Sequence, residues 1–277
     1  MNPLGGFARR QSYWNEFSKK YPAKPYLRID GGALFSIGAA ESPVVNRWML
    51  EGTRKSNLDA LGLNAWDLPA WQELGDLAAA GMLPRELLSL PLVSANVAPK
   101  AASFPAVRRS IIKEVSVDPK TGRKFRVGIT ALLFDPEERI SRGDFAVEDP
   151  AVAARKVIAE LRPATDYRVV LTDADLGRAM SLAIGVPGIN LLVVSHDYVA
   201  ASDAQQIGDT LIVVTVNEGR MFSDVRLQVP AGSARIQAEM RFVPLDRTIP
   251  DDAAMGEFVR RGQTAVDDVK KGKSPAY

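Results

Sequence analysis

Apolar residues recur along the chain with two periods, one typical of helices and one typical of strands. Between residues 149 and 161 every third or fourth residue is apolar and Pro150 stands in the first turn, which predicts an amphipathic helix. Residues 190–195 centre on an unbroken apolar run, the pattern of a strand covered on both faces. Alternating arms on either side of DPKTG at residues 118–122 predict a hairpin over residues 110–133.

The same patterns place the other elements of an α/β fold. Helices are expected at residues 11–20, 44–50, 57–61, 69–80, 85–90, 176–184 and 251–271. Strands are expected at residues 26–29, 91–96, 167–171, 211–216, 221–227 and 236–243, with 211–216 and 221–227 paired to each other. Strands that alternate with helices and are joined by hairpins predict a mixed sheet sandwich with helices outside. We assign residues 1–250 to this sandwich domain and residues 251–277 to a C-terminal charged helix and mobile tail.

Composition narrows the function classes. Of the 277 residues, 46% are hydrophobic and 25% are charged, the balance of an ordinary globular protein. No apolar run approaches the roughly 18 residues that a membrane helix needs, so we expect no membrane span. The formal charge is +2 and the Lys and Arg residues are scattered, so we expect no nucleic-acid partner.

Two residue counts limit the chemistry. The chain has no cysteine, which excludes disulfides, thiolate metal sites and a cysteine nucleophile. His196 is the only histidine, so the sequence cannot supply a site built from several imidazoles. Residues 1–10 contain no apolar segment of the kind found in signal peptides.

Several short phrases are spaced along the chain in an informative order. They are GGFARR (residues 5–10), YLRIDGGALF (26–35), LGLNA (61–65), PLVSANV (91–97) and VPGINLLVVSH (186–196). In this order they resemble the N-terminal domain of the 5'-nucleotidase family of calcineurin-like metallophosphoesterases, which reads GG-x-AR, LLLDAGDLF, LGYDA, PVLSANV and VPGIDLIVGGH. The resemblance implies a four-layer αββα sandwich of two mixed β-sheets. It also implies two metal ions that activate a hydroxide at the carboxyl ends of the strands.

The departures from the family's metal ligands matter more than the matches. Ala33 stands at the bridging aspartate of the DAGD loop, and Ala70 and Trp71 stand at the amide and imidazole of the GNHE loop. The family's L-S-H reads LTD and ends in Asp173, and its G-H-x-H reads SHDY and keeps only His196. The family's D-x-H strand precedes the segment at which this sequence begins. The resemblance therefore implies a degenerate metal site, because one or two ligands do not hold a catalytic metal pair.

Five residues are candidates for a residual site, and each also has a structural explanation. The candidates are His196, Asp173, Asp30, Asp175 and Asp197. His196 is either a metal ligand or a histidine with local hydrogen bonds. Asp173 or Asp175 is either part of the site or a helix cap, and Asp30 is either part of the site or a turn residue before two glycines.

Trp66 and Trp71 allow two interpretations. Their rings either line a ligand pocket where the family binds metal, or fill core volume left by the lost site. No phosphate-binding glycine loop, GxSxG elbow or HExxH motif is present.

Three functions remain open at this point. The first is a non-catalytic binding or scaffold domain, a pseudoenzyme for which no cofactor is expected. The second is a phosphoesterase with a single divalent metal at His196, Asp173 and Asp30. The third is a nucleotide or small-molecule pocket without chemistry.

The resemblance also suggests a partner. Degenerate relatives resemble domains attached to multihaem cytochrome c modules in exported bacterial proteins, and residues 274–277, SPAY, resemble the lead-in to such a module. A missing C-terminal multihaem cytochrome c domain and an extracytoplasmic location are the corresponding expectations.

Overall fold

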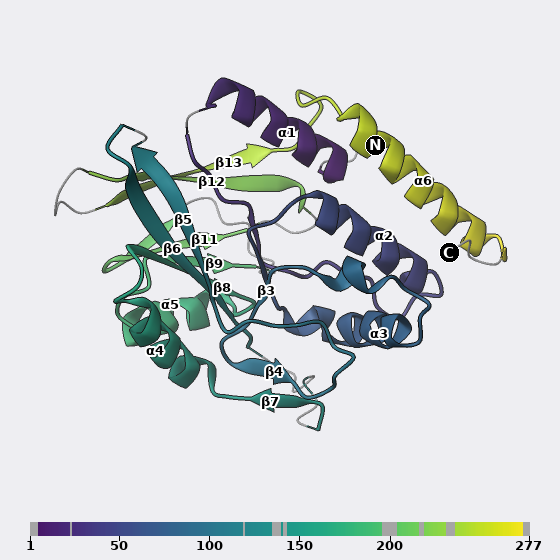
Figure 1. Cartoon of the computed structure of the whole chain (residues 1–277), viewed down its shortest axis with the longest axis horizontal. Coiled ribbons are helices and arrows are strands. Elements are labelled where there is room, and N and C mark those ends of the chain that lie inside the picture. The colour runs from purple at the N-terminus through teal and green to yellow at the C-terminus, as the bar shows by residue number, and fades with distance from the viewer. Residues whose placement is uncertain are drawn as a thin grey trace.

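Two β-sheets face each other at the centre of the molecule, and helices cover their outer faces (Figure 1). The coordinates are a computed structural model. The structure describes residues 5–22, 24–118, 120–134, 140, 143–195, 204–215, 219–230 and 236–273.

The larger sheet is mixed and has the strand order β10-β11-β9-β8-β6-β5. Its four central strands run parallel, and the two edge strands are antiparallel to their neighbours. The strands are β5 (Ile111–Asp118), β6 (Arg123–Leu132), β8 (Tyr167–Thr172), β9 (Leu191–Val194), β10 (Gln205–Ile207) and β11 (Thr210–Val214).

The smaller sheet is parallel and has the order β1-β2-β3. Its strands are β1 (Ile29–Asp30), β2 (Ala60–Gly62) and β3 (Leu92–Val93). A hairpin of β12 (Met221–Gln228) and β13 (Gln237–Pro244) packs against the same core as this sheet. A separate ribbon is formed by β4 (Val97–Pro99) and β7 (Phe145–Val147).

Successive residues of the central strands enter different cores, as the two-residue period of a strand requires. Val169 and Leu171 of β8 point into the core between the sheets, whereas Val170 points into the core beneath the outer helices. In β11, Leu211 likewise points into the core between the sheets, and Ile212 points into the core beneath the outer helices. Continuous apolar runs in the sequence therefore correspond to strands buried on both faces.

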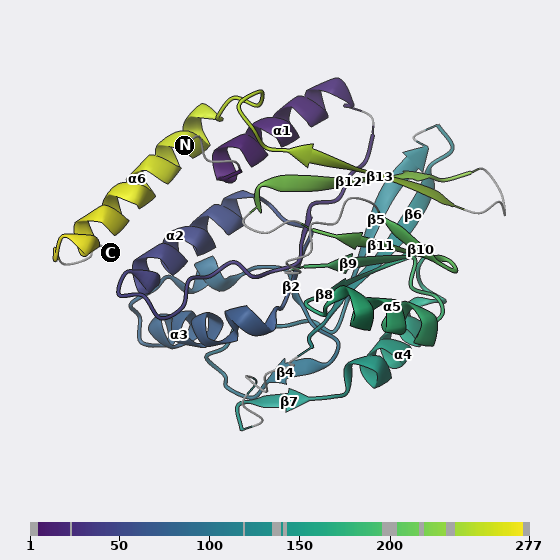
Figure 2. The same ribbon diagram turned by 180° about the vertical axis from the view of Figure 1, so that it is seen from behind.

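The helices complete four layers, which Figure 2 shows from behind. Helices α4 (Pro150–Leu161) and α5 (Leu176–Gly185) cover the larger sheet. Helices α2 (Ser42–Lys55) and α3 (Leu68–Ala79) pack on the smaller one, with short 3-10 turns η1 (Ala65–Asp67) and η2 (Arg85–Leu88) beside them. The predicted αββα class is confirmed, but only the larger sheet is mixed, because the strands of the smaller sheet all run parallel.

Helices α1 (Phe7–Lys20) and α6 (Ala253–Lys270) come from opposite ends of the sequence and lie side by side. Ala8 packs against Met255 and Phe258, and the backbone N–H of Asp252 donates to the Ala8 carbonyl at 3.1 Å. The division of the chain at residue 250 stays a prediction, but α6 is packed on the sandwich rather than separate from it.

Two predictions about secondary structure are wrong. Residues 57–61 do not form a helix, because Asn57 adopts a left-handed φ of 49° that breaks the chain away from α2, and the next residues enter β2. Strands β11 and β12 do not pair. The apolar β11 lies inside the larger sheet beside β9, whereas β12, which is half-buried along most of its length, pairs with β13.

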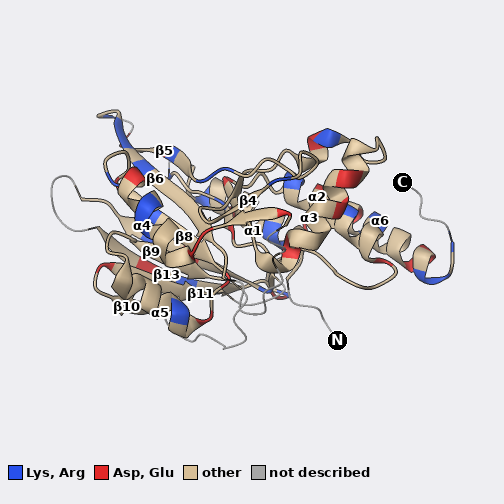
Figure 3. Cartoon of the chain, turned by 90° about the horizontal axis from the view of Figure 1, so that it is seen from below, with Lys and Arg blue, Asp and Glu red and all other residues tan. Residues whose placement is uncertain are grey.

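Charged residues are dispersed over the described elements, with Lys and Arg interspersed with Asp and Glu (Figure 3). No described helix is long and apolar enough to cross a membrane.

Candidate functional site

The carboxyl ends of strands from both sheets meet at one edge of the sandwich. The side chain of Asp173, directly after β8, contacts the loops that follow β2 and β6. The hydroxyl of Ser195, after β9, donates to the Gly31 carbonyl after β1 at 3.1 Å. Ligand and catalytic sites of parallel sheets form at such an edge, so this is the candidate site.

Asp173 connects the two sheets through its two carboxylate oxygens. Oδ1 accepts from the Phe134 backbone N–H at 2.6 Å, and Oδ2 accepts from the Ala65 N–H at 2.9 Å. The carboxylate does not cap α5. It instead accepts hydrogen bonds from backbone N–H groups of two loops. These N–H groups lie beyond the ends of the strands and need a partner other than a neighbouring strand.

Asp30 is both a turn residue and half of an ion pair. Its Oδ1 accepts from the Gly32 N–H at 3.1 Å, which is an Asx turn. Its Oδ2 lies 2.8 Å from the Arg10 guanidinium, and only 15% of the Asp30 side chain and 16% of the Arg10 side chain are exposed. Since the guanidinium also lies over the Trp14 ring, Arg10 is fixed from two sides.

Of the other three candidates, the structure describes only Asp175. Asp175 caps α5, because its carboxylate accepts from the Arg178 N–H at 2.9 Å, as the capping interpretation predicts. His196 and Asp197 lie outside the described residues.

Asp67 is the site residue that the sequence did not reveal. It is 1% exposed, and Oδ1 accepts from the N–H groups of Leu34 and Phe35 at 2.8 and 3.0 Å. Burial raises the pKa of Asp67 to about 7, although the backbone donors act in the opposite direction. The residue stands at the N-cap position of α3, but its side chain forms no capping hydrogen bond. An aspartate at the start of a helix is typical of a cap, so the sequence alone does not indicate that Asp67 binds the loop after β1.

The loop that Asp67 holds contains Ala33, which has a left-handed φ of 60°. Gly31 and Gly32 precede it at places with no room for a side chain. A Cβ on Gly31 would lie 2.5 Å from the Ser195 Cβ, and one on Gly32 would lie 2.6 Å from the Gly62 carbonyl oxygen. The close approach of the strand ends therefore requires both glycines.

The two tryptophans have different environments. Trp71 is 1% exposed and meets Phe35 edge-to-face with ring centroids 4.8 Å apart, so the core interpretation holds for it. Trp66 is 37% exposed, and its indole N–H donates to the Phe35 carbonyl at 3.3 Å. Trp66 therefore places an aromatic surface beside the candidate site. Ala70, next to Trp71, is buried at 3% exposure.

Two buried asparagines stabilise the adjoining loops. Asn64 Oδ1 accepts from the Trp66 N–H at 2.9 Å, while its Nδ2 has no hydrogen-bond partner among the described residues. The Asn96 side chain both donates to the Leu133 carbonyl and accepts from the Leu133 N–H.

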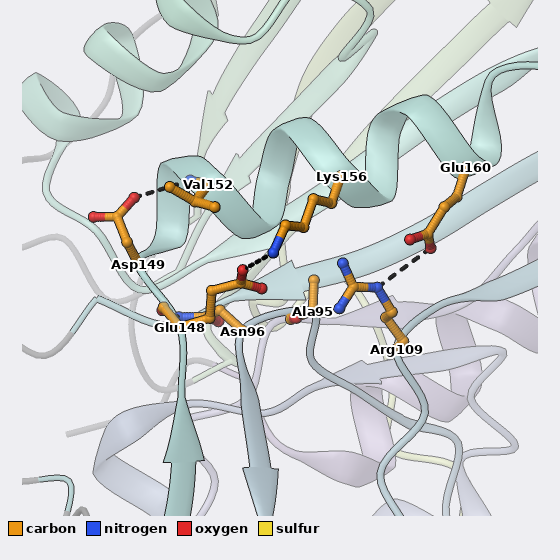
Figure 4. A network of polar contacts seen from close by, with 8 residues as sticks. All are labelled: Ala95, Asn96, Arg109, Glu148, Asp149, Val152, Lys156 and Glu160. Carbon is orange, nitrogen blue, oxygen red and sulfur yellow. Dashed lines mark hydrogen bonds and ion pairs between the residues drawn. The ribbon is translucent and has the colours of Figure 1, made fainter.

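The segment around Asn96 is tied to α4 by the polar network of Figure 4. Glu148 pairs with Lys156 and Arg109 pairs with Glu160, while the Arg109 guanidinium also donates to the Ala95 carbonyl at 3.2 Å. Ion pairs this accessible to solvent contribute little to stability.

The fold has known counterparts. No protein-family model and no curated protein matches the sequence. Among solved structures, a sulfate thiohydrolase SoxB from Thermus thermophilus has a TM-score of 0.74 at 16% identity, over 96% of this chain and 48% of that one. A 5'-nucleotidase precursor, also from Thermus thermophilus, has a TM-score of 0.70 at 18% identity, over 97% of this chain and 55% of that one. The chain has the 5'-nucleotidase fold.

The Haemophilus influenzae NAD nucleotidase agrees, with a TM-score of 0.71 at 16% identity over 96% of this chain. The chain spans 48% to 62% of the length of these three structures. The resemblance drawn from the sequence phrases is confirmed at the level of the fold.

Three of the side chains at the metal-ligand positions of the resemblance lack the donors that a metal ion needs. The methyl groups of Ala33 and Ala70 and the indole of Trp71 offer no lone pair to a divalent cation. Within the described ranges, no three His, Cys, Asp or Glu residues form a group that could hold a metal. The described residues therefore do not fit the two-metal centre that the resemblance implies.

Proposed function

We propose that this chain is a non-catalytic metallophosphoesterase-like domain that acts by binding a ligand or a partner. The observation that carries the proposal is Trp71. In the sequence resemblance, the Trp71 indole takes the place of the family's imidazole that would assist the leaving group. The indole is buried in the core and packs against Phe35. A buried indole in that position can neither protonate a leaving group nor bind a metal ion.

The roles of the remaining carboxylates support the same proposal. Both oxygens of Asp173 accept backbone N–H groups, and the oxygens of Asp30 are used by Gly32 and Arg10. In a two-metal hydrolase the cations hold the strand-end loops together. Here hydrogen bonds to Asp173 and Asp67 connect these loops.

Metal content and turnover measured together test the proposal. The purified chain is exposed to manganese, zinc and iron, its bound metal is measured, and it is assayed with phosphomonoesters, phosphodiesters and nucleotides. We expect neither stoichiometric metal nor turnover. Stoichiometric metal with hydrolysis that His196→Ala abolishes and Asp76→Asn leaves intact would establish the mononuclear hydrolase instead.

Ligand binding without chemistry has its own readout. Thermal stabilisation by nucleotides in the presence of a metal chelator would assign the site to nucleotide binding, because a ligand that binds only the folded state raises the unfolding temperature. The exposed ring of Trp66 is the surface on which a base would stack.

The multihaem cytochrome partner and the extracytoplasmic location rest on the resemblance. A reading frame that continues beyond Tyr277 into Cys-x-x-Cys-His motifs would support the partner. A stop codon directly after Tyr277 would remove it.

A further inference from the structure

A shallow groove of about 550 Å³, which we call the α3 groove, runs along the solvent face of α3. Residues that are three or four positions apart share one face of a helix, and the residues that line the groove from Pro69 to Ala80 follow this spacing. The opposite face of α3, with Trp71 and Leu74, is buried in the core. The groove therefore lies on the outside of the molecule, where a partner can reach it (Figure 1).

The apolar residues of the α3 groove are accessible to solvent. Met82 is 63% exposed, Pro69 and Ala80 are exposed, and Leu77 is half-buried. Gly81 has a left-handed φ of 77°, and the Met82 N–H donates to the Leu77 carbonyl at 2.9 Å, so α3 ends in a Schellman motif. This turn brings Met82 back to the end of the groove. Its flexible thioether side chain can adapt to an apolar partner surface.

The charge of the α3 groove is negative. Glu73 and Asp76 are both exposed, and neither α3 nor the lining of the groove contains a Lys or an Arg. Asp76 accepts from Gln72 Nε2 at 3.0 Å, whereas Glu73 forms no hydrogen bond or ion pair within the described part of the chain. The whole chain has a formal charge of +2, so the negative charge is local to this face.

The dimensions of the α3 groove fit a short helix. Pro69 and Ala80 are 11 positions apart, which corresponds to about 17 Å along the helix axis, or about three turns of a partner helix. A strip of this length and about 10 Å in width is much smaller than the roughly 800 Å² per partner of a standard protein interface. The groove therefore suits a helical segment better than a second globular copy of this chain.

We propose that the α3 groove binds a basic amphipathic helix of a partner protein. Apolar side chains on one face of the partner helix pack against Leu77 and Met82, and a Lys or Arg beside that face pairs with Glu73. Helices that bind in grooves use apolar anchors spaced three or four residues apart, which matches the spacing of the groove. No residue that joins the strand ends lines the groove, so the proposal does not depend on the function proposed for the strand-end edge.

The test measures the binding of three labelled peptides to the whole chain by fluorescence anisotropy. The first is an amphipathic Leu/Lys helix of about 14 residues, long enough to span the groove. The second has Glu in place of every Lys, and the third has the composition of the first in a shuffled order without an apolar face. We expect one site that binds the amphipathic Leu/Lys peptide at least tenfold more tightly than either of the others.

Variants locate the site. Met82→Ser should weaken the Leu/Lys peptide about tenfold, because an apolar side chain is no longer buried on binding. Glu73→Gln should weaken it about threefold at low salt and have no effect at about 1 M salt, where surface charges are screened. The matched controls are Ile184→Ser, at an exposed apolar residue of α5, and Glu239→Gln, at an exposed glutamate of β13. Both controls should leave binding unchanged, and circular dichroism checks that each variant is folded.

Four results would overturn the proposal. The first two are no saturable binding of the Leu/Lys peptide up to about 1 mM and equal affinity for the shuffled peptide. The third is equal weakening by the control variants, which would place the peptide elsewhere on the chain. The fourth is reversible dimerisation of the chain in analytical ultracentrifugation that Met82→Ser removes, which would assign the groove to a second copy.

Discussion

The buried carboxyl of Asp67 makes a quantitative prediction about stability. Its pKa is raised from 3.8 to about 7 in the folded chain, chiefly by burial. In the unfolded chain the group is solvated and ionises near its ordinary value. The folded state therefore keeps a proton that the unfolded state has already released over the interval between the two pKa values.

The sign follows from proton linkage. Below about pH 4 both states hold the proton, and above about pH 8 neither does. Between these limits the unfolded chain binds fewer protons, so the free energy of unfolding falls as pH rises. A difference of about 3 pKa units corresponds to about 4 kcal/mol, and the full burial of the side chain gives no reason to discount it for solvent screening.

The perturbation is Asp67→Asn, which keeps an oxygen for the Leu34 and Phe35 N–H groups and removes the titration. Urea unfolding of both proteins is followed from pH 4 to pH 8.5. The wild-type free energy of unfolding minus that of Asp67→Asn should fall by about 4 kcal/mol across this range. Asp76→Asn, a change at an exposed position of the adjoining helix α3, should show the wild-type profile.

A difference between wild type and Asp67→Asn that stays constant with pH, or increases, would refute the reasoning. It would mean that the backbone donors stabilise the carboxylate more than burial penalises it. The loop after β1 would then be held by an ionised group throughout this pH range.

Three other predictions concern packing and capping. Trp71→Ala should lower the free energy of unfolding by about 3 to 5 kcal/mol in urea denaturation, because it empties the core under α3; a loss below about 1 kcal/mol would contradict the core assignment. Gly75→Ala should be destabilising in thermal melts, since its Cβ would lie 2.2 Å from the Ser103 carbonyl oxygen, whereas Gly185→Ala, with open space around it, should be neutral or stabilising. Asp175→Ala should cost about 1 kcal/mol by removing the α5 cap, and no change in the urea midpoint would count against that cap.

The sequence was most informative where local pattern and burial agree. The period of residues 149–161 and Pro150 in the first turn predicted α4, whose first turn Asp149 caps. The hairpin of β5 and β6 was predicted by its alternation and turn, and it forms as expected. Each of these elements is specified by contacts between residues close in sequence.

The failures have a common physical cause, which is tertiary context. Ala60 and Leu61 look equally suited to a helix or a strand, and the position between β1 and β3 decides. The strand with which β12 pairs, β13, is likewise decided by packing in the folded chain and not by the residues of β12 alone. In the sequence, Asp67 resembles an ordinary helix cap. Its actual role depends on the distant loop at Leu34, whose N–H donates to the Asp67 carboxylate in the folded chain.

The seam between α1 and α6 has a consequence for the order of assembly. The Asp252 N–H reaches the Ala8 carbonyl, and Phe258 packs near Ala8, across almost the whole length of the chain. A contact with this sequence separation closes a very large loop, so it forms late. During synthesis the ribosome releases α6 only after every strand of both sheets has emerged. The part of α1 around Ala8 therefore stays uncovered until α6 has been synthesised.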